Sequence, residues 1–287
     1  MKTVKKYSGK KIVIIAVLVA VLVALLVGAI LIGSPEKGSL SEELTDAVLH
    51  EDKQFSLFGL INVNPALISA YIVTAVLLIF AACVRIFAVP RFREVPGKFQ
   101  LVIEQAVSFF DNMAKTNSPH KNGFLGCYIF AAGCYIFVGT LFELFGIQMT
   151  AAGGQSVSLP APLSDINAAI AMGFLSYFVI LGGGIATNGV RGLGRALKEF
   201  SLPLSMSFRL FGALLSGLLV TELVYYVIYL SIGLPVIVGV LFTLLHALIQ
   251  AYVLTMLTAT YFGEVTEPAK KKGKRAAKSK HKETVAA

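Results

Sequence analysis

Charged side chains are scarce in this sequence. Asp, Glu, Lys and Arg make up 14% of its 287 residues, whereas hydrophobic residues make up 56%. A typical soluble domain carries roughly 25% charged residues. The shortage is uneven, because long stretches without any charge alternate with short charged segments. This pattern excludes an ordinary soluble domain and predicts an integral membrane protein.

The uncharged stretches are continuously apolar and show no alternation of polar and apolar residues. Several reach the ~20 residues that a helix needs to cross ~30 Å of hydrocarbon. In lipid only helices and closed barrels satisfy the backbone polar groups, and a barrel strand would alternate. We therefore expect an all-α integral membrane protein.

Cysteine is also scarce. Cys83, Cys127 and Cys134 all lie in apolar stretches, with no His or carboxylate beside them at ligand spacing. Three scattered cysteines exclude a disulfide framework. We interpret them as packing residues, and we expect no metal and no cofactor.

Six apolar stretches predict six membrane helices. The first, residues 12–33, follows a basic start and exceeds the 7–15 residues of a signal-peptide core, so we expect a retained span. The last two are longer than a perpendicular crossing requires, and we expect them to be strongly tilted. The other five predicted spans are 64–87, 124–147, 164–186, 203–232 and 234–262.

The remaining segments differ in composition. Residues 34–60 are polar and acidic and form an expected external segment, and residues 264–287 form a basic tail that we expect to be disordered. Residues 61–263 form the main membrane domain. Apolar residues recur at helical spacing between Phe99 and Met113, which predicts an amphipathic helix lying on the membrane surface or packed on a partner subunit.

The basic residues are distributed asymmetrically. With a cytoplasmic N-terminus, six crossings return the C-terminus to the same side. All 25 Lys and Arg residues except Lys37, Lys53 and Arg209 then lie on the cytoplasmic side. Such an excess is typical of cytoplasmic loops. The net charge of +9 is therefore mainly an orientation signal, and we expect no nucleic-acid partner.

Arg209 interrupts the fifth stretch. Placing an arginine at mid-membrane costs about 2.5–3.5 kcal/mol. Its guanidinium stays protonated, so it cannot relay a proton, but it can keep a nearby carboxylate ionised. We interpret it as a functional cation that meets a carboxylate of a partner helix; the alternative is an arginine that snorkels to the headgroups. Small residues that would allow close approach surround it: Ser201, Ser205, Gly212, Ala213, Ser216 and Gly217.

Three more polar residues lie in the last two stretches. Glu222 follows Arg209 by thirteen residues, which in a helix is ~20 Å along the axis, so it is better placed to face water on the outer side. His246 and Gln250 are four residues apart and share a helix face. A histidine inside the membrane can exchange protons near neutral pH. A structural hydrogen bond is the alternative role for both.

Four short motifs stand out along the chain: VPGKFQ at 95–100, PLSDIN at 162–167, RLFG at 209–212 and IQAYVLTMLT at 249–258. Together they resemble the signature of subunit a of F-type ATP synthases. They occur in that family's order and spacing and span roughly residues 60–263, so the first predicted span is an addition to the family's minimal five.

The resemblance implies a non-catalytic subunit whose last two helices pack against a rotating ring of c-subunit proteolipids. In that family an arginine separates two aqueous half-channels, and a proton rides the ring from one to the other. The resemblance puts Arg209 in this role and Gln250 in that of the neighbouring glutamine. It also implies peripheral-stalk b subunits as partners and the plasma membrane of a bacterium as the location, with both termini in the cytoplasm.

Three further residues are candidates for the half-channels. Asp165 and Asn167 match the family's polar pair at the outer end of a span, although Asp165 could instead cap a helix. Glu199, near the start of the fifth helix, is the candidate for the inner half-channel. Its alternative is an ordinary interfacial charge.

The chain departs from the family at three positions. The family usually has Asn where this chain has Ala213, often Glu at Leu218, and His or Glu at Thr243. Glu222 lies one turn after Leu218, and His246 lies about one turn after Thr243. We hypothesise that the outer half-channel keeps its chemistry with both groups displaced by a turn.

Two other functions compete with this interpretation. A secondary transporter or channel that binds an anionic substrate at Arg209 would be expected to have inverted repeats and broken helices. A non-transporting scaffold would not explain three ionisable groups in the last two spans. A gene for a small two-helix proteolipid beside this one would favour the synthase.

The displaced half-channel makes a direct prediction. Glu222→Leu and His246→Ala should each reduce ATP-driven proton pumping in membrane vesicles, because each removes a group that exchanges protons. Quenching of a pH-sensitive dye measures the pumping. Wild-type coupling in both variants would contradict the hypothesis.

Overall fold

The structure is a computed structural model that describes residues 55–57, 61–150, 156–226 and 234–268, with six single positions between 17 and 27. The predicted first span, apart from those six positions, lies outside the described residues. So do the acidic segment before residue 55 and the basic tail after residue 268.

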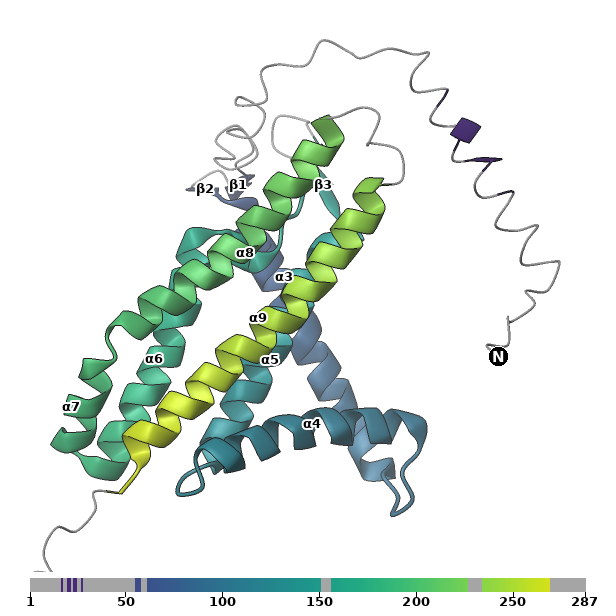
Figure 1. Ribbon diagram of the computed structural model, residues 1–287. Helices are drawn as coiled ribbons and strands as arrows, with labels where there is room; N and C mark the ends of the chain where they lie inside the picture. Colours follow the sequence, from purple (N-terminus) through teal and green to yellow (C-terminus); the bar gives the residue numbers. More distant parts are fainter. Residues whose placement is uncertain are drawn as a thin grey trace, which may run out of the picture. The chain divides into compact units, whose positions relative to one another are not determined.

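Helices dominate the described residues, as predicted (Figure 1). Two short antiparallel hairpins accompany them: β1 (Phe55–Leu57) with β2 (Ile61–Val63), and β3 (Gln148–Thr150) with β4 (Ser156–Ser158). The α-helices are α3 (Pro65–Cys83), α4 (Lys98–Asn117), α5 (Gly123–Phe142), α6 (Ile166–Asn188), α7 (Val190–Lys198), α8 (Ser201–Tyr226) and α9 (Leu234–Thr266).

Four helices within the described residues are long and apolar enough to cross a membrane. They confirm the predicted second, third, fourth and sixth spans. The predicted fifth span is α8, a helix of 26 residues; residues 227–232, up to its predicted end, lie outside the described residues. Six crossings and the tilt of the last two helices stay predictions. The four segments are Pro65–Arg91, Gly123–Phe145, Ile166–Asn188 and Gly239–Thr266.

Local sequence explains where these helices begin and end. Asp165 caps α6, because its carboxylate accepts a hydrogen bond from the Asn167 amide at 2.6 Å. Gly189 ends the same helix with a φ of 57°, a conformation that favours glycine. Pro90 has no amide hydrogen, and α3 accordingly continues through a π-helical turn into a 3-10 turn at Val89–Arg91.

The chain forms two compact units, and α5, α6, α8 and α9 each contribute a segment to both. The first unit comprises Met1–Ala81, Tyr135–Ala169 and Phe208–Ala251, and the second comprises Ala82–Cys134, Ile170–Ser207 and Tyr252–Ala287. In the first unit, Val73 of α3, Phe142 of α5 and Leu159 form a buried apolar cluster.

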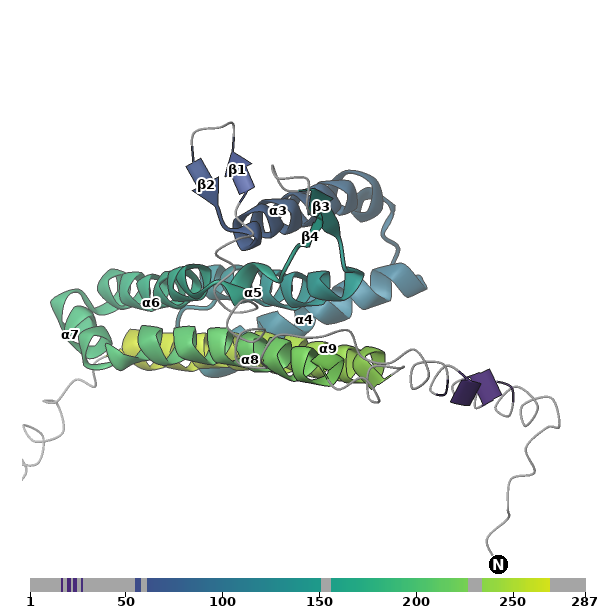
Figure 2. The same cartoon turned by 90° about the horizontal axis from the view of Figure 1, so that it is seen from above.

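The second unit has a core to which several helices contribute. Buried residues of α4, α5, α6, α7, α8 and α9 meet there, among them Ala114, Ile129, Ile180, Met206 and Phe262. Figure 2 shows α7 leaving the end of α6 at a sharp turn, where sequence analysis identified only a basic connection. The helix returns close enough for the Tyr177 hydroxyl to donate a hydrogen bond to the Ala196 carbonyl at 3.2 Å.

Helix α4 confirms the predicted amphipathic helix. Met113 and Ala114 are buried in the core, whereas Phe99, Val102 and Phe109 are exposed. Exposed aromatic and aliphatic side chains on one helix fit either of its two expected surroundings, the membrane surface or a partner subunit.

The turn from α6 to α7 depends on two glycines in contact. A Cβ built on Gly192 would overlap the backbone carbonyl of Gly184, whereas one on Gly194 meets nothing within 4 Å. Both Gly192 and Gly194 lie in α7. The first is therefore required by packing and the second is not.

We predict that Gly192→Ala destabilises the protein by about 1–3 kcal/mol, since the added methyl group forces the backbone apart. Gly194→Ala, the matched control in the same helix, should be neutral or slightly stabilising, because alanine favours the helix. Thermal unfolding in detergent measures both. Equal effects in the two variants would contradict this account of the turn.

Candidate functional site

A small polar cavity lies among three helical segments of the first unit. It has a volume of about 10 Å³, close to what one water molecule requires. Two of the residues that line it carry groups that exchange protons: the Glu143 carboxyl and the His246 imidazole. The full lining is Glu143, Ala213, Leu214, Gly217, Thr243 and His246.

Local structure explains how these side chains meet. Glu143 begins the 3-10 turn Glu143–Phe145 that continues α5, and Gly146 ends that turn with a φ of 54°. From α8, Gly217 presents no side chain, and a Cβ there would lie 3.8 Å from Nδ1 of His246. On α9 the His246 ring contacts the ring of Phe242, with 5.8 Å between their centroids. A methyl group at position 217 would therefore make an ordinary van der Waals contact with the imidazole, whereas a bulkier side chain would crowd it.

Glu143 was missed by sequence analysis. It lies within the predicted third span, 124–147, as a carboxylate in an otherwise apolar stretch. Ionisable residues inside membrane spans are rare and generally functional. That signal was available in the sequence.

The cavity bears on two of the three positions at which the chain departs from the family pattern. Ala213 and Thr243 both line it, so the groups expected there would point at the same space that Glu143 and His246 now share. The side chain of Leu218, the third position, lies outside the described residues.

Arg209 lies in α8, also in the first unit, with an exposed side chain. Ser205, Gly212 and Ser216 lie on the same face at spacings of three or four residues and are exposed as well. No residue in the described ranges forms a hydrogen bond or an ion pair with the guanidinium. The guanidinium therefore lies on an exposed face of α8 that is made of small residues.

The other predicted residues are placed as follows. Gln250 lies one turn after His246 on α9, and its side chain is only 7% exposed. Glu222 lies in α8, but its side chain is outside the described residues. Glu199 follows the end of α7 and precedes α8 by two residues, and it belongs to the second unit.

Asp165 and Asn167 lie at the beginning of α6 in the first unit. The two oxygens of the Asp165 carboxylate accept hydrogen bonds from the Asn167 amide and, at 2.7 Å, from the side-chain amide of Asn64. The capping role considered for Asp165 is thus present in the structure. Asn167 itself is exposed.

The described residues contain no group of three or more His, Cys, Asp or Glu side chains that could hold a metal ion. These features define an all-helical membrane protein that carries ionisable groups inside apolar helices. In this class such groups mark ion or substrate pathways.

Comparison with known proteins identifies the family. A family model described as "ATP synthase A chain" matches residues 67–263, more than half of the chain. The chain belongs to this family. A curated relative, "ATP synthase subunit a, chloroplastic" of Bigelowiella natans, is 39% identical over 74 residues. That match covers 22% of this chain and 30% of the relative.

The cavity predicts that Glu143 lies on a proton path. Glu143→Gln should reduce proton transport by vesicles carrying the assembled ATP synthase roughly tenfold or more, because the amide cannot accept and release a proton. Glu143→Asp should retain part of it. Glu94→Gln, which changes an exposed carboxylate between α3 and α4, is the control.

Full transport by Glu143→Gln would show that the carboxylate is not required. A loss in the Glu94→Gln control would mean that general damage to the complex explains the result. The amount of assembled complex in the membranes should be measured in each variant.

Proposed function

We propose that this chain is the stator subunit through which ions, in the first place protons, cross the membrane part of a rotary ATP synthase. The observation that carries the proposal is the exposed guanidinium of Arg209 on a face of small residues in α8. Membership of the ATP synthase A chain family supports it.

The electrostatics of Arg209 define its proposed role. A guanidinium keeps its charge at every physiological pH, so it lowers the pKa of a carboxylate that approaches and drives release of its proton. It also repels a proton that would pass directly. The c-ring proteolipids are the proposed source of the carboxylate, because Gly212 and the serines beside Arg209 leave room for a second helix.

The proposed outer half-channel is built around the Glu143–His246 cavity. A carboxyl group and an imidazole around space for one water molecule can exchange a proton through that water. Glu222 remains a proposed member from α8, and Gln250 a proposed neighbour of the arginine. Asp165 and Asn167 are proposed to line the entrance, and the cap that Asp165 provides would hold both in place.

Glu199 is the proposed residue of the inner half-channel. It follows α7, a helix that carries Arg191, Arg195 and Lys198. This concentration of positive charge supports a cytoplasmic position. A carboxylate at that end of the membrane domain is suited to receive a proton that leaves toward the cytoplasm.

The proposed assembly extends beyond the c-ring. Peripheral-stalk b subunits are proposed partners, and the chemistry of ATP would take place on other subunits, so that this chain is not itself catalytic. The charge asymmetry supports a multi-pass protein with both termini in the cytoplasm. The plasma membrane of a bacterium is the proposed location.

We predict that Arg209→Ala abolishes ATP-driven proton pumping and raises the passive proton permeability of membranes stripped of their catalytic sector. The neutral side chain would neither release the ring proton nor block its direct passage. Arg209→Lys should also impair pumping, because a desolvated ammonium can lose its proton whereas guanidinium cannot.

Arg191→Ala is the matched control, since it removes an exposed arginine from α7. Dye quenching measures pumping, and the decay of an imposed pH gradient measures the leak. Normal pumping by Arg209→Ala in an assembled complex would overturn the proposed function.

A further inference from the structure

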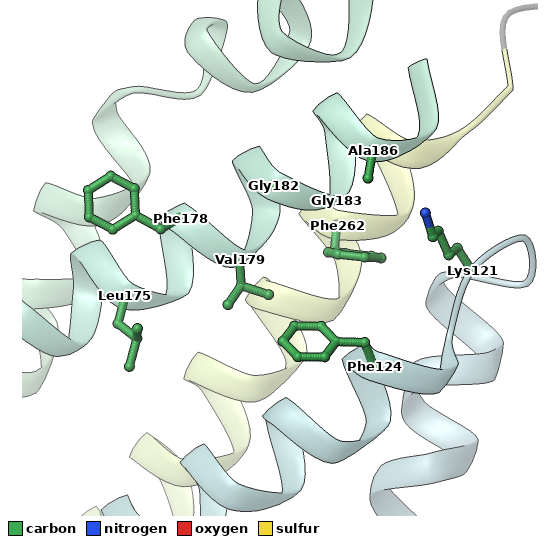
Figure 3. Close-up of a pocket in the computed structure, with 9 residues that line it drawn as sticks. All are labelled: Lys121, Phe124, Leu175, Phe178, Val179, Gly182, Gly183, Ala186 and Phe262. Atoms are coloured by element: carbon green, nitrogen blue, oxygen red, sulfur yellow. The ribbon is translucent and has the colours of Figure 1, made fainter. Parts of the chain in front are cut away.

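The second unit contains an apolar cavity of about 440 Å³, within the range of small-molecule sites. It belongs neither to the polar cavity nor to the face around Arg209. Segments of α5, α6 and α9 and the loop before α5 line it (Figure 3). Its lining is Lys121, Phe124, Leu175, Phe178, Val179, Gly182, Gly183, Ala186 and Phe262.

The lining of the cavity extends along α6. Its lining residues on α6 extend from Leu175 to Ala186, a distance of about 16 Å at 1.5 Å per residue. That is close to half of the ~30 Å hydrocarbon layer, the depth of a single leaflet. A cavity of this length accepts an extended chain.

The floor and the rim of the cavity have different character. Phe262 of α9 is 3% exposed and forms the floor, and Gly183 permits this because a Cβ there would overlap the phenyl ring. At the rim Phe124 is 70% and Phe178 is 59% exposed. The cavity is therefore closed toward the core of the unit and open toward its surroundings.

Lys121 provides the only charge on the lining. It lies two residues before α5, and Figure 3 shows its side chain at the end of the cavity near Ala186. The Ser118 hydroxyl donates a hydrogen bond to the Lys121 carbonyl at 2.9 Å and lies 3.4 Å from the Thr266 hydroxyl, which ties the loop to α9. None of the described residues forms an ion pair with Lys121.

We propose that this cavity binds one anionic phospholipid, with an acyl chain along α6 and the headgroup phosphate on Lys121. The positive charge of Lys121 at one end of the cavity complements the anionic headgroup. The apolar lining along the rest of the cavity suits an acyl chain. A lysine is a suitable point charge for a phosphate. Basic recesses between membrane helices on the cytoplasmic side are known to hold anionic headgroups.

The volume argues against a transmembrane helix of a partner subunit as the occupant. A helix with its side chains is about 10 Å or more across, so 16 Å of it needs roughly 1,300 Å³. The cavity provides about a third of that volume. A single acyl chain is the better match.

The test uses the assembled complex in nanodiscs that contain phosphatidylcholine and a small fraction of a photoactivatable phosphatidylglycerol, with the reactive group on the acyl chain. Mass spectrometry maps the labelled residues. We expect labelling at Phe124, Phe178 and Phe262. The same probe with a phosphatidylcholine headgroup should label these positions about five-fold less, the factor expected for one basic side chain beside an anionic lipid.

Two variants separate the headgroup contact from the chain contact. Lys121→Gln should abolish the preference for phosphatidylglycerol, and Gly182→Leu should block labelling by both probes. A Cβ at Gly182 meets nothing within 4 Å, so a leucine there fills the cavity without a backbone clash. The controls are Lys115→Gln, which removes a lysine paired with Asp111, and Gly194→Leu, at an open position of α7.

Equal labelling by the two probes in the wild-type complex would overturn the proposal, because it would identify an ordinary lipid-facing surface. A cross-link from the cavity to a partner subunit would overturn it as well. If the complex that carries Gly182→Leu fails to assemble, the Lys121→Gln variant still tests the proposal, because its preference for the phosphatidylglycerol probe can be measured on its own. The preference is independent of proton transport, so it does not depend on the function proposed for Arg209.

Discussion

A permanent positive charge inside an apolar helix is the constraint on which the rest of this protein depends. The insertion cost of Arg209 persists unless its guanidinium meets an anion or water. The described part of the chain offers no carboxylate to it, and the residues on its face of α8 are small. In the proposed function, both observations direct the charge outward, toward a partner subunit. The other ionisable groups are then proposed steps by which a proton reaches or leaves that partner.

Glycines allow helical segments of this protein to approach each other closely. At the Gly184–Gly192 contact the absence of side chains allows α7 to turn back from α6. At Gly217 a Cβ would lie 3.8 Å from Nδ1 of His246, an ordinary van der Waals distance, so the imidazole packs directly against α8. In lipid, apolar burial contributes little to helix association, so van der Waals contact of this kind becomes a main source of stability. Glycine thus occurs both at a tight turn and beside an ionisable side chain.

Much of the fold followed from hydrophobicity. Four predicted spans and the amphipathic α4 were found within a few residues of their predicted limits, because the length of an apolar stretch and the positions of Gly, Pro and Asp determine where a membrane helix begins and ends. The site was predicted less completely. Arg209 and His246 were identified as charges within apolar stretches, whereas Glu143 was not. The short helix α7 was not predicted either: its nine residues were identified only as a basic connection, although its apolar residues recur at helical spacing.

The sequence by itself determined that this is a helical membrane protein, which described helices are long and apolar enough to cross a membrane, and which cation interrupts the apolar helix α8. These properties depend on the transfer of side chains between water and lipid, which each segment experiences alone. Only the tertiary structure decided that Glu143 shares a cavity with His246, that Ala213 and Thr243 face the same space, and that Asp165 is held by Asn64. Such contacts join residues that are far apart in the chain. They depend on how helices rotate and pack, and no local pattern specifies that.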